Sequence, residues 1–288
     1  MPKSKTEIQI EHMFAPLNWA SASNAFPEKG ALSIRLNNFA NGKNDGEYEI
    51  EQKITSTFAT SSVEMWHRSI HSFLISASLT KASPVWSSVS GYYSSHYSMR
   101  AFAHLLGYFQ LRKRRKIVQL EIDGGNYLCK IKGKHGDDAE HKSYWKIVKS
   151  HSDFSSDPFF TNNEDELPNY GSDRRSDVGH RSIANYLDHI GGFPSFQMLN
   201  HEYLKQRVNK ISDMELSDAP IPRLDLYPDM DNVQLIAYHR LVRFKSYLDN
   251  IFGDSNRFWK VHRKPSWCMP FLDFQIVSPV YTGVYKDI

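Results

Sequence analysis

The chain has 288 residues, of which 40% are hydrophobic, and it carries 35 Lys and Arg against 32 Asp and Glu. This length and apolar content allow a substantial core, and a net charge of only +3 excludes a chain that attracts nucleic acid through its overall field. The two cysteines, Cys129 and Cys268, are far apart and match no metal-ligand spacing, which argues against a disulfide scaffold and a structural zinc site.

The sequence also lacks the hydrophobic segments that direct a chain to a membrane. Its first residues, MPKSKTEIQIEHMF, contain no apolar signal region. No stretch approaches the roughly 18 uninterrupted apolar residues of a membrane span. We therefore expect a cytoplasmic protein that makes no membrane contact.

The first half of the chain predicts an arm followed by two long helices. Residues 1–43 contain Pro16, Pro27, Gly30 and Gly42 between short mixed segments, which indicates an arm that packs over a core. Over residues 47–81, apolar side chains recur at helical spacing without Pro or Gly, which predicts a long amphipathic helix. Ser83 and Pro84 are typical of a helix start, and the second helix should run past Tyr108, antiparallel to the first.

A run of cations follows this second predicted helix. We call Arg112, Lys113, Arg114 and Arg115 the basic run. At the carboxyl end of a helix these charges would neutralise the negative end of the helix dipole. They are also candidates to bind an RNA backbone, with Tyr92 or Tyr108 available for base stacking.

The next segment predicts a small β-containing insert at residues 113–170. Alternating residues at 117–122 and 127–132 flank Asp123, Gly124, Gly125 and Asn126, which is the pattern of a β-hairpin with a tight turn. A helical turn is expected at residues 141–148, and a polar, acidic connection follows it.

The second half predicts further helices and an apolar tail. We expect helices at residues 172–189, 201–213 and 231–252, the last with a broad apolar stripe and Gly253 as its stop. Residues 254–288 are rich in aromatic side chains around prolines and should dock on the core or on a partner protein. The predicted fold class is mainly α.

Several enzyme classes lack their sequence motifs here. The chain contains no GxxxxGK[ST] phosphate loop, no GxGxxG after a strand, and neither HExxH nor GxSxG. We therefore expect no nucleotide cofactor and no metal.

Residues 88–107, SVSGYYSSHYSMRAFAHLLG, resemble the second helix of the HEPN superfamily. The resemblance implies a HEPN-like helical bundle over residues 44–253, interrupted by the insert. Many members of that family are metal-independent endoribonucleases that carry Arg, four to six residues, then His on a late helix. By resemblance we expect an RNA substrate, a homodimer or a partner protein, and a bacterial toxin or antiphage defence setting.

The segment RRSDVGHRS matches this ribonuclease motif. Arg175 lies five residues before His180, and Arg174 lies six residues before it. His180 would act as general base or acid, and Arg175 with Arg174 would bind the phosphate. A packed histidine beside two solvated arginines is the alternative interpretation.

A second pair, Arg100 and His104, lies one turn apart on a more strongly predicted helix. It is either a structural pair or part of the same cleft. Two rival functions stay open beside the endoribonuclease: a non-catalytic HEPN-like scaffold for a partner protein, and a nucleic-acid-binding component that uses the basic run.

Overall fold

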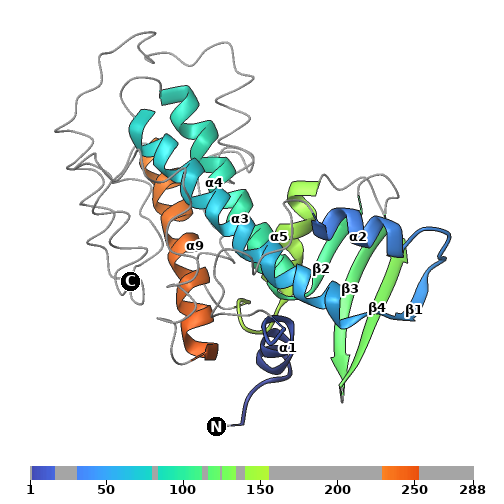
Figure 1. Ribbon diagram of the computed structural model, residues 1–288. Helices are drawn as coiled ribbons and strands as arrows, with labels where there is room; N and C mark the ends of the chain where they lie inside the picture. Colours follow the sequence, from blue (N-terminus) through green and yellow to red (C-terminus); the bar gives the residue numbers. More distant parts are fainter. Residues whose placement is uncertain are drawn as a thin grey trace. The chain divides into compact units, whose positions relative to one another are not determined.

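The computed structural model describes residues 2–16, 31–79, 84–111, 116–123, 125–133, 140–155 and 229–252. These residues are mainly helical and contain one four-stranded antiparallel sheet, which confirms the predicted mainly α class (Figure 1). The helices predicted at 172–189 and 201–213, and the tail at 254–288, lie outside the described residues.

The described elements are six helices and four strands. The helices are α1 (Lys5–Phe14), α2 (Ala31–Phe39), α3 (Gln52–Leu79), α4 (Pro84–Leu105), α5 (Glu140–Ser150) and α9 (Asp229–Phe252). The strands are β1 (Gly46–Glu49), β2 (Tyr108–Leu111), β3 (Lys116–Asp123) and β4 (Asn126–Gly133).

The chain divides into two compact units, and α3, α4 and α9 supply residues to both. The first unit comprises Met1–Met65, Met99–His151 and Tyr247–His262, and it contains the sheet. The second comprises Trp66–Ser98, Ser152–Ser246 and Arg263–Ile288, and its described part is helical.

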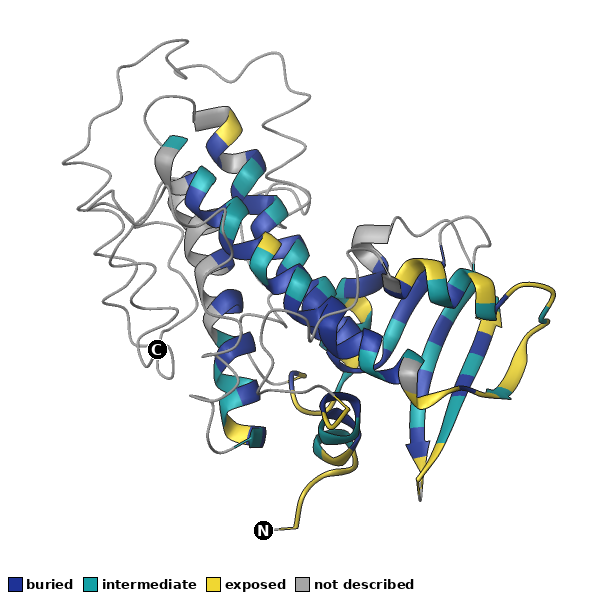
Figure 2. Ribbon diagram, viewed as in Figure 1, coloured by how far each residue is buried: buried dark blue, intermediate teal, exposed yellow. Residues whose placement is uncertain are grey.

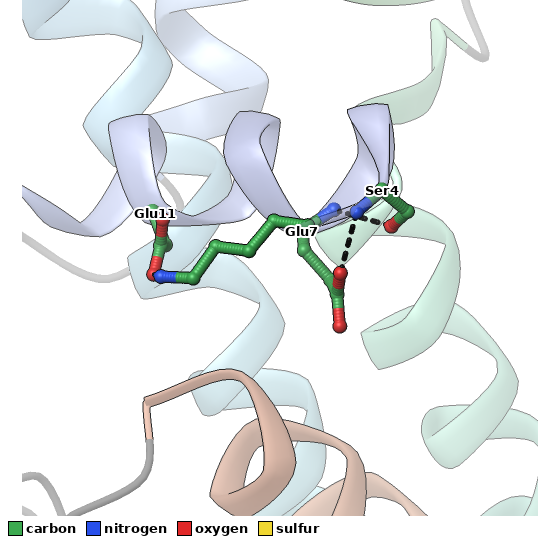
Figure 3. Close-up of polar contacts among 4 residues, drawn as sticks. Ser4, Glu7 and Glu11 are labelled. Atoms are coloured by element: carbon green, nitrogen blue, oxygen red, sulfur yellow. Dashed lines mark hydrogen bonds and ion pairs between the residues drawn. The ribbon is translucent and has the colours of Figure 1, made fainter. Parts of the chain in front are cut away.

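Helix α1 begins at a capping box within the segment expected to be an arm. The Ser4 hydroxyl accepts a hydrogen bond from the backbone N–H of Glu7 at 3.2 Å, and the Glu7 carboxylate accepts one from the backbone N–H of Ser4 at 2.6 Å (Figure 3). Lys3 also pairs with Glu11. This exchange satisfies two backbone donors that a helix start leaves without intrahelical partners, so it fixes where α1 begins.

The predicted start of the first long helix is wrong, because strand β1 precedes it. Residues Gly46–Glu49 pair antiparallel with β4, and α3 begins only at Gln52. Glu47 lies opposite Lys130 and forms an ion pair with it at 3.0 Å. Pairing with a distant strand therefore overrides the local helical pattern at this end.

The predicted end of the second long helix is also wrong. Helix α4 stops at Leu105, and Gly107 takes a left-handed conformation with φ of +83°, which ends the helix. The Gly107 carbonyl then accepts a hydrogen bond from Leu120 N–H at 2.8 Å, and β2 begins at Tyr108. The basic run therefore follows a strand and does not cap a helix.

Other elements match the predictions closely. Strands β3 and β4 form the expected hairpin, with Asp123 opposite Asn126 and Gly125 at a φ of +90° in the turn. Helices α5 and α9 each begin and end within two residues of their predicted bounds. The sheet is nevertheless larger than the expected hairpin, because β1 and β2 extend it to the order β1-β4-β3-β2.

One face of the sheet belongs to the core of the first unit. Burial alternates along β3 and β4, as the colours in Figure 2 show, because successive side chains point to opposite faces. Helix α2 lies across the sheet in Figure 1. The rings of Phe39, the last residue of α2, and Tyr48 of β1 meet at 6.4 Å. The buried strand residues on this face are Phe109, Leu111, Val118, Leu120, Ile122, Cys129 and Ile131.

Serines join α3 and α4 within the second unit. The Ser69 hydroxyl donates to the Ser94 carbonyl at 2.5 Å, and the Ser94 hydroxyl donates back to the Ser69 carbonyl at 2.8 Å. Ser76 and Ser87 exchange the same two bonds at 2.7 Å each. A step of seven residues forward in α3 matches seven residues back in α4, which confirms the predicted antiparallel pair.

Helix α9 completes the described part of the second unit. The Trp66 indole N–H donates to the Leu241 carbonyl at 2.9 Å, and its ring stacks on Phe244 at 5.8 Å. Arg240 is 1% exposed and donates to the Ser95 hydroxyl. These contacts join α9 to α3 through Trp66 and to α4 through Arg240.

Candidate functional site

The last turns of α4 bring a predicted pair of functional residues together. Arg100 and His104 are four residues apart, so they lie on the same side of the helix in the first unit. His104 is 0% exposed, and its Nδ1 lies 3.0 Å from the hydroxyl of Ser61 on α3. This contact orients the imidazole ring.

Helix α5 covers the same pair with a tyrosine. The Tyr144 ring meets the His104 ring edge-on at 5.8 Å, and the Arg100 guanidinium lies 5.3 Å from the centre of that tyrosine ring. The Tyr144 hydroxyl accepts a long hydrogen bond, 3.4 Å, from the backbone N–H of Gln110. Phe109, the neighbouring residue in β2, packs on His104 at 5.2 Å. The residues of this polar cluster are Ser61, Arg100, His104, Phe109, Gln110 and Tyr144.

The surroundings of His104 favour the neutral imidazole. Burial lowers the pKa of His104 well below its ordinary value, and the nearby Arg100 charge lowers the pKa further. A hydrogen bond to Ser61 acts in the opposite direction, and burial outweighs it. His104 is therefore uncharged at neutral pH, although a cation at the carboxyl end of a helix would be favoured by the helix dipole.

Two polar atoms of the cluster lack hydrogen-bond partners among the described residues. They are Nε2 of His104 and the side-chain oxygen of Gln110, and both are buried. A buried polar atom without a hydrogen bond costs free energy, because its desolvation is not compensated.

The enclosure of His104 limits the chemistry that the cluster can perform. An imidazole with 0% exposure does not reach the 2′-hydroxyl or the phosphate of an RNA chain. In this arrangement the pair Arg100 and His104 fits a packing role, with the Tyr144 ring against both side chains.

The remaining predicted site residues are distributed as follows. Arg174, Arg175 and His180 lie outside the described residues, and so do Arg112, Lys113, Arg114 and Arg115. Tyr92 is 1% exposed in the second unit and stacks on His96 at 6.2 Å, so it does not present its ring to a base. Tyr108 is half-buried on β2.

Sequence reasoning missed Ser61, Gln110 and Tyr144. Ser61 is one of many serines on α3, and no local pattern distinguishes it. Tyr144 has a usable signal, because it lies in the strongly amphipathic segment HKSYWKIV. The strand that carries Gln110 was not predicted, because the helical spacing of apolar residues in α4 continues to Tyr108.

The opposite face of the sheet carries a polar network. Lys130 pairs with Glu121 at 2.7 Å and with Glu47 at 3.0 Å, and these bonds raise the pKa of Lys130. Tyr108 and Gln119 lie in the same row of the sheet, because they are register partners and Gln119 also lies opposite Lys130. Burial, followed by the Glu121 charge, raises the pKa of Tyr108.

The described residues bring no three His, Cys, Asp or Glu side chains together in a group that could hold a metal ion. Within the described ranges, every helix is too short or too polar to cross a bilayer.

Comparisons with known proteins add no assignment. No family model matches the chain, and no curated protein or solved structure matches it either.

Proposed function

We propose that the protein binds RNA and that the basic run contacts the RNA phosphates. Support comes from the strands on either side of the run. Strand β2 ends at Leu111, β3 begins at Lys116, and these two residues are paired in the antiparallel ladder. The run therefore joins two paired strands. The helix-capping role that the sequence offered as its structural explanation does not apply, because α4 ends at Leu105.

The charges beside the run support the same proposal. Lys116 donates to the Lys43 carbonyl at 2.7 Å, and Lys132 is exposed in the neighbouring strand. Asp45 lies 3.7 Å from the Lys116 ammonium group and also accepts the Gly133 N–H at 2.6 Å. The described residues at this end thus include three lysines and one aspartate, to which the run adds four cations. Such clustering attracts a polyanion even when the net charge of the chain is small.

RNA cleavage is the second candidate function. Because His104 is enclosed, this proposal assigns the chemistry to the motif that contains Arg174, Arg175 and His180. In this proposal the chain is a HEPN-like metal-independent endoribonuclease, a homodimer of a toxin or antiphage system. His180 exchanges the proton of the attacking 2′-hydroxyl, while Arg175 and Arg174 neutralise the phosphate. His104 takes no part, because it is enclosed.

Binding is tested with a labelled single-stranded RNA by fluorescence anisotropy. The variant R114Q/R115Q removes two charges from the run, and K3Q/K5Q removes two charges from the start of α1 as a matched control. The proposal expects weaker binding for the first variant and unchanged binding for the second. Equal affinity for wild type and R114Q/R115Q contradicts it and favours a scaffold that binds a partner protein.

Cleavage is tested on the same RNA with EDTA present. The second candidate expects products with cyclic-phosphate ends from wild type, none from His180→Ala or Arg175→Ala, and unchanged cleavage of RNA by a folded His104→Gln. DNA of the same sequence should stay intact because it lacks the 2′-hydroxyl nucleophile. Cleavage that persists in His180→Ala refutes the assignment of the motif, and RNA binding without cleavage leaves only the first proposal.

A further inference from the structure

Helix α5 buries Ser143, Tyr144 and Val148 in the first unit, and Tyr144 is the residue through which it contacts the polar cluster. Tyr144 is 0% exposed and contacts His104, Arg100 and the backbone of Gln110. Beyond α5, His151 Nε2 lies 3.3 Å from the Thr6 hydroxyl of α1. The helix has only 11 residues, and so short a helix depends on its tertiary contacts for stability.

The cluster holds two groups that repel each other when both are charged. Arg100 is always cationic, and it lies on the same helix face as His104 and on the same tyrosine ring. Around His104, α3 contributes the neutral hydroxyl of Ser61, β2 contributes Phe109, and α5 contributes the phenol of Tyr144. Among the described residues, the charged group that acts on His104 is Arg100.

We propose that α5 is an acid-released latch: protonation of His104 opens the contact between α5 and the corner formed by α4 and β2. The closed cluster accommodates only the neutral imidazole, because a second cation would be buried beside Arg100. Opening moves Tyr144 away, so that water reaches His104 and screens its charge from that of Arg100. The proposal is independent of RNA binding.

Opening of α5 has a direct consequence for strand β2. The Gln110 N–H loses its bond to the Tyr144 hydroxyl, which leaves the outer edge of β2 available for pairing. This strand leads directly into Arg112. Acid would therefore change the strand that precedes the basic run while the β3–β4 hairpin stays paired.

The size of the effect follows from proton linkage. When α5 is open, His104 titrates near its ordinary value of about 6.5, and when α5 is closed it stays neutral. The equilibrium constant for opening then increases roughly tenfold between pH 7.5 and pH 5.5. Raising the pH above 7.5 closes α5 no further, because His104 is then neutral in both the open and the closed state.

Hydrogen exchange of the full-length chain, read by mass spectrometry on peptides from α5 and β4, tests the latch. Rates are corrected for the pH dependence of chemical exchange. We expect α5 amides to exchange through a local opening that low urea hardly affects, whereas β4 amides require unfolding that urea promotes. The corrected α5 rate should rise about tenfold from pH 7.5 to pH 5.5.

Variants separate His104 from other causes of acid sensitivity. His104→Gln should abolish the pH dependence of α5 opening, while the matched control His151→Gln should keep it. Tyr144→Phe should open α5 a few-fold more at every pH and keep the tenfold pH response, which supplies a test if His104→Gln does not fold. A wild-type α5 rate that is independent of pH, or that matches β4 in rate and urea dependence, overturns the proposal. So does a pH response that persists in folded His104→Gln.

Discussion

Replacing Gly107 by alanine should strongly destabilise the first unit, because this glycine is both left-handed and closely packed. Its φ is +83°, and an added Cβ would lie 2.9 Å from Gln9 Nε2, 3.0 Å from Leu120 Cβ and 3.1 Å from the Leu120 carbonyl oxygen. The Gln9 amide can move away. The two Leu120 atoms belong to the central strand β3, and the Leu120 N–H donates to the Gly107 carbonyl. Moving them away from a new Cβ would therefore disturb both this hydrogen bond and the sheet.

The expected loss is the sum of two effects. A left-handed alanine costs about 1–2 kcal/mol, and the reduced freedom of the unfolded chain offsets roughly 0.4–1 kcal/mol of this. Overpacking against Leu120 adds about 1–3 kcal/mol. Gly107→Ala should therefore lower the free energy of unfolding of the first unit by about 1–5 kcal/mol, with a middle value of about 3 kcal/mol.

Gly42→Ala is the matched control for this prediction. Gly42 has a similar φ of +72°, but an added Cβ would meet nothing within 4 Å. It should lose only about 1 kcal/mol, from backbone conformation alone. Both losses can be measured by hydrogen exchange of β3 and β4 amides in urea. If Gly107→Ala loses no more than Gly42→Ala, the close packing of α4, β2 and β3 around Gly107 is refuted.

Three further predictions concern single side chains. Ser69→Ala and Ser94→Ala should each lower the free energy of unfolding by about 1 kcal/mol, because each removes a hydroxyl that bonds a carbonyl of the facing helix. A double-mutant cycle should show coupling because the two hydroxyl oxygens also lie 3.1 Å apart; simple additivity would contradict this contact. Burial raises the pKa of Cys129 to about 12, so iodoacetamide should not label this thiol at pH 8 until the chain is unfolded. Rapid labelling of Cys129 in the folded chain would contradict its burial. His104 is neutral in the folded chain and titrates in the unfolded chain, so its contribution to the free energy of unfolding should be constant above about pH 6.5 and fall below that pH. Urea unfolding measures this free energy, and an equal fall in a His104→Gln variant would exclude His104 as the cause.

The fold was predictable wherever local pattern and tertiary structure agree. Helix α9 shows an uninterrupted apolar stripe, and the β3–β4 hairpin has a glycine turn between alternating strands, so each carries its own signal. Helix α1 also had a signal that the prediction did not use, the capping box of Ser4 and Glu7. Elements of this kind are visible in a single sequence because neighbours along the chain determine them.

The edges of the sheet were not predictable in the same way. Strand β1 has four residues and depends on its register with β4, while β2 has four residues and follows a helix whose apolar spacing continues into it. Gly107 was the local clue to the end of α4, since a glycine after the last helical turn commonly takes the left-handed conformation. Strand β1 pairs with a strand far along the chain, which no local window contains, whereas β2 pairs with the next strand, β3, and was missed because the helical spacing continues through it.

The polar cluster was predictable only in part. The spacing of Arg100 and His104 on one helix face placed two of its members together. Ser61 comes from 43 residues earlier in the chain, and Tyr144 contacts Gln110 across 34 residues. Burial of His104, which decides its charge, follows from those distant partners and not from its own neighbours in the sequence.

The salt dependence of RNA binding tests the central claim, binding through the basic run, most directly. Affinity of wild type, R114Q/R115Q and K3Q/K5Q for a single-stranded RNA is measured across a range of salt concentrations. Each lost phosphate contact reduces the slope of log affinity against log salt by about 0.7, so R114Q/R115Q should lose about 1.4 from the wild-type slope. K3Q/K5Q should keep that slope. An unchanged slope for R114Q/R115Q, or an equal loss in both variants, contradicts binding through the run.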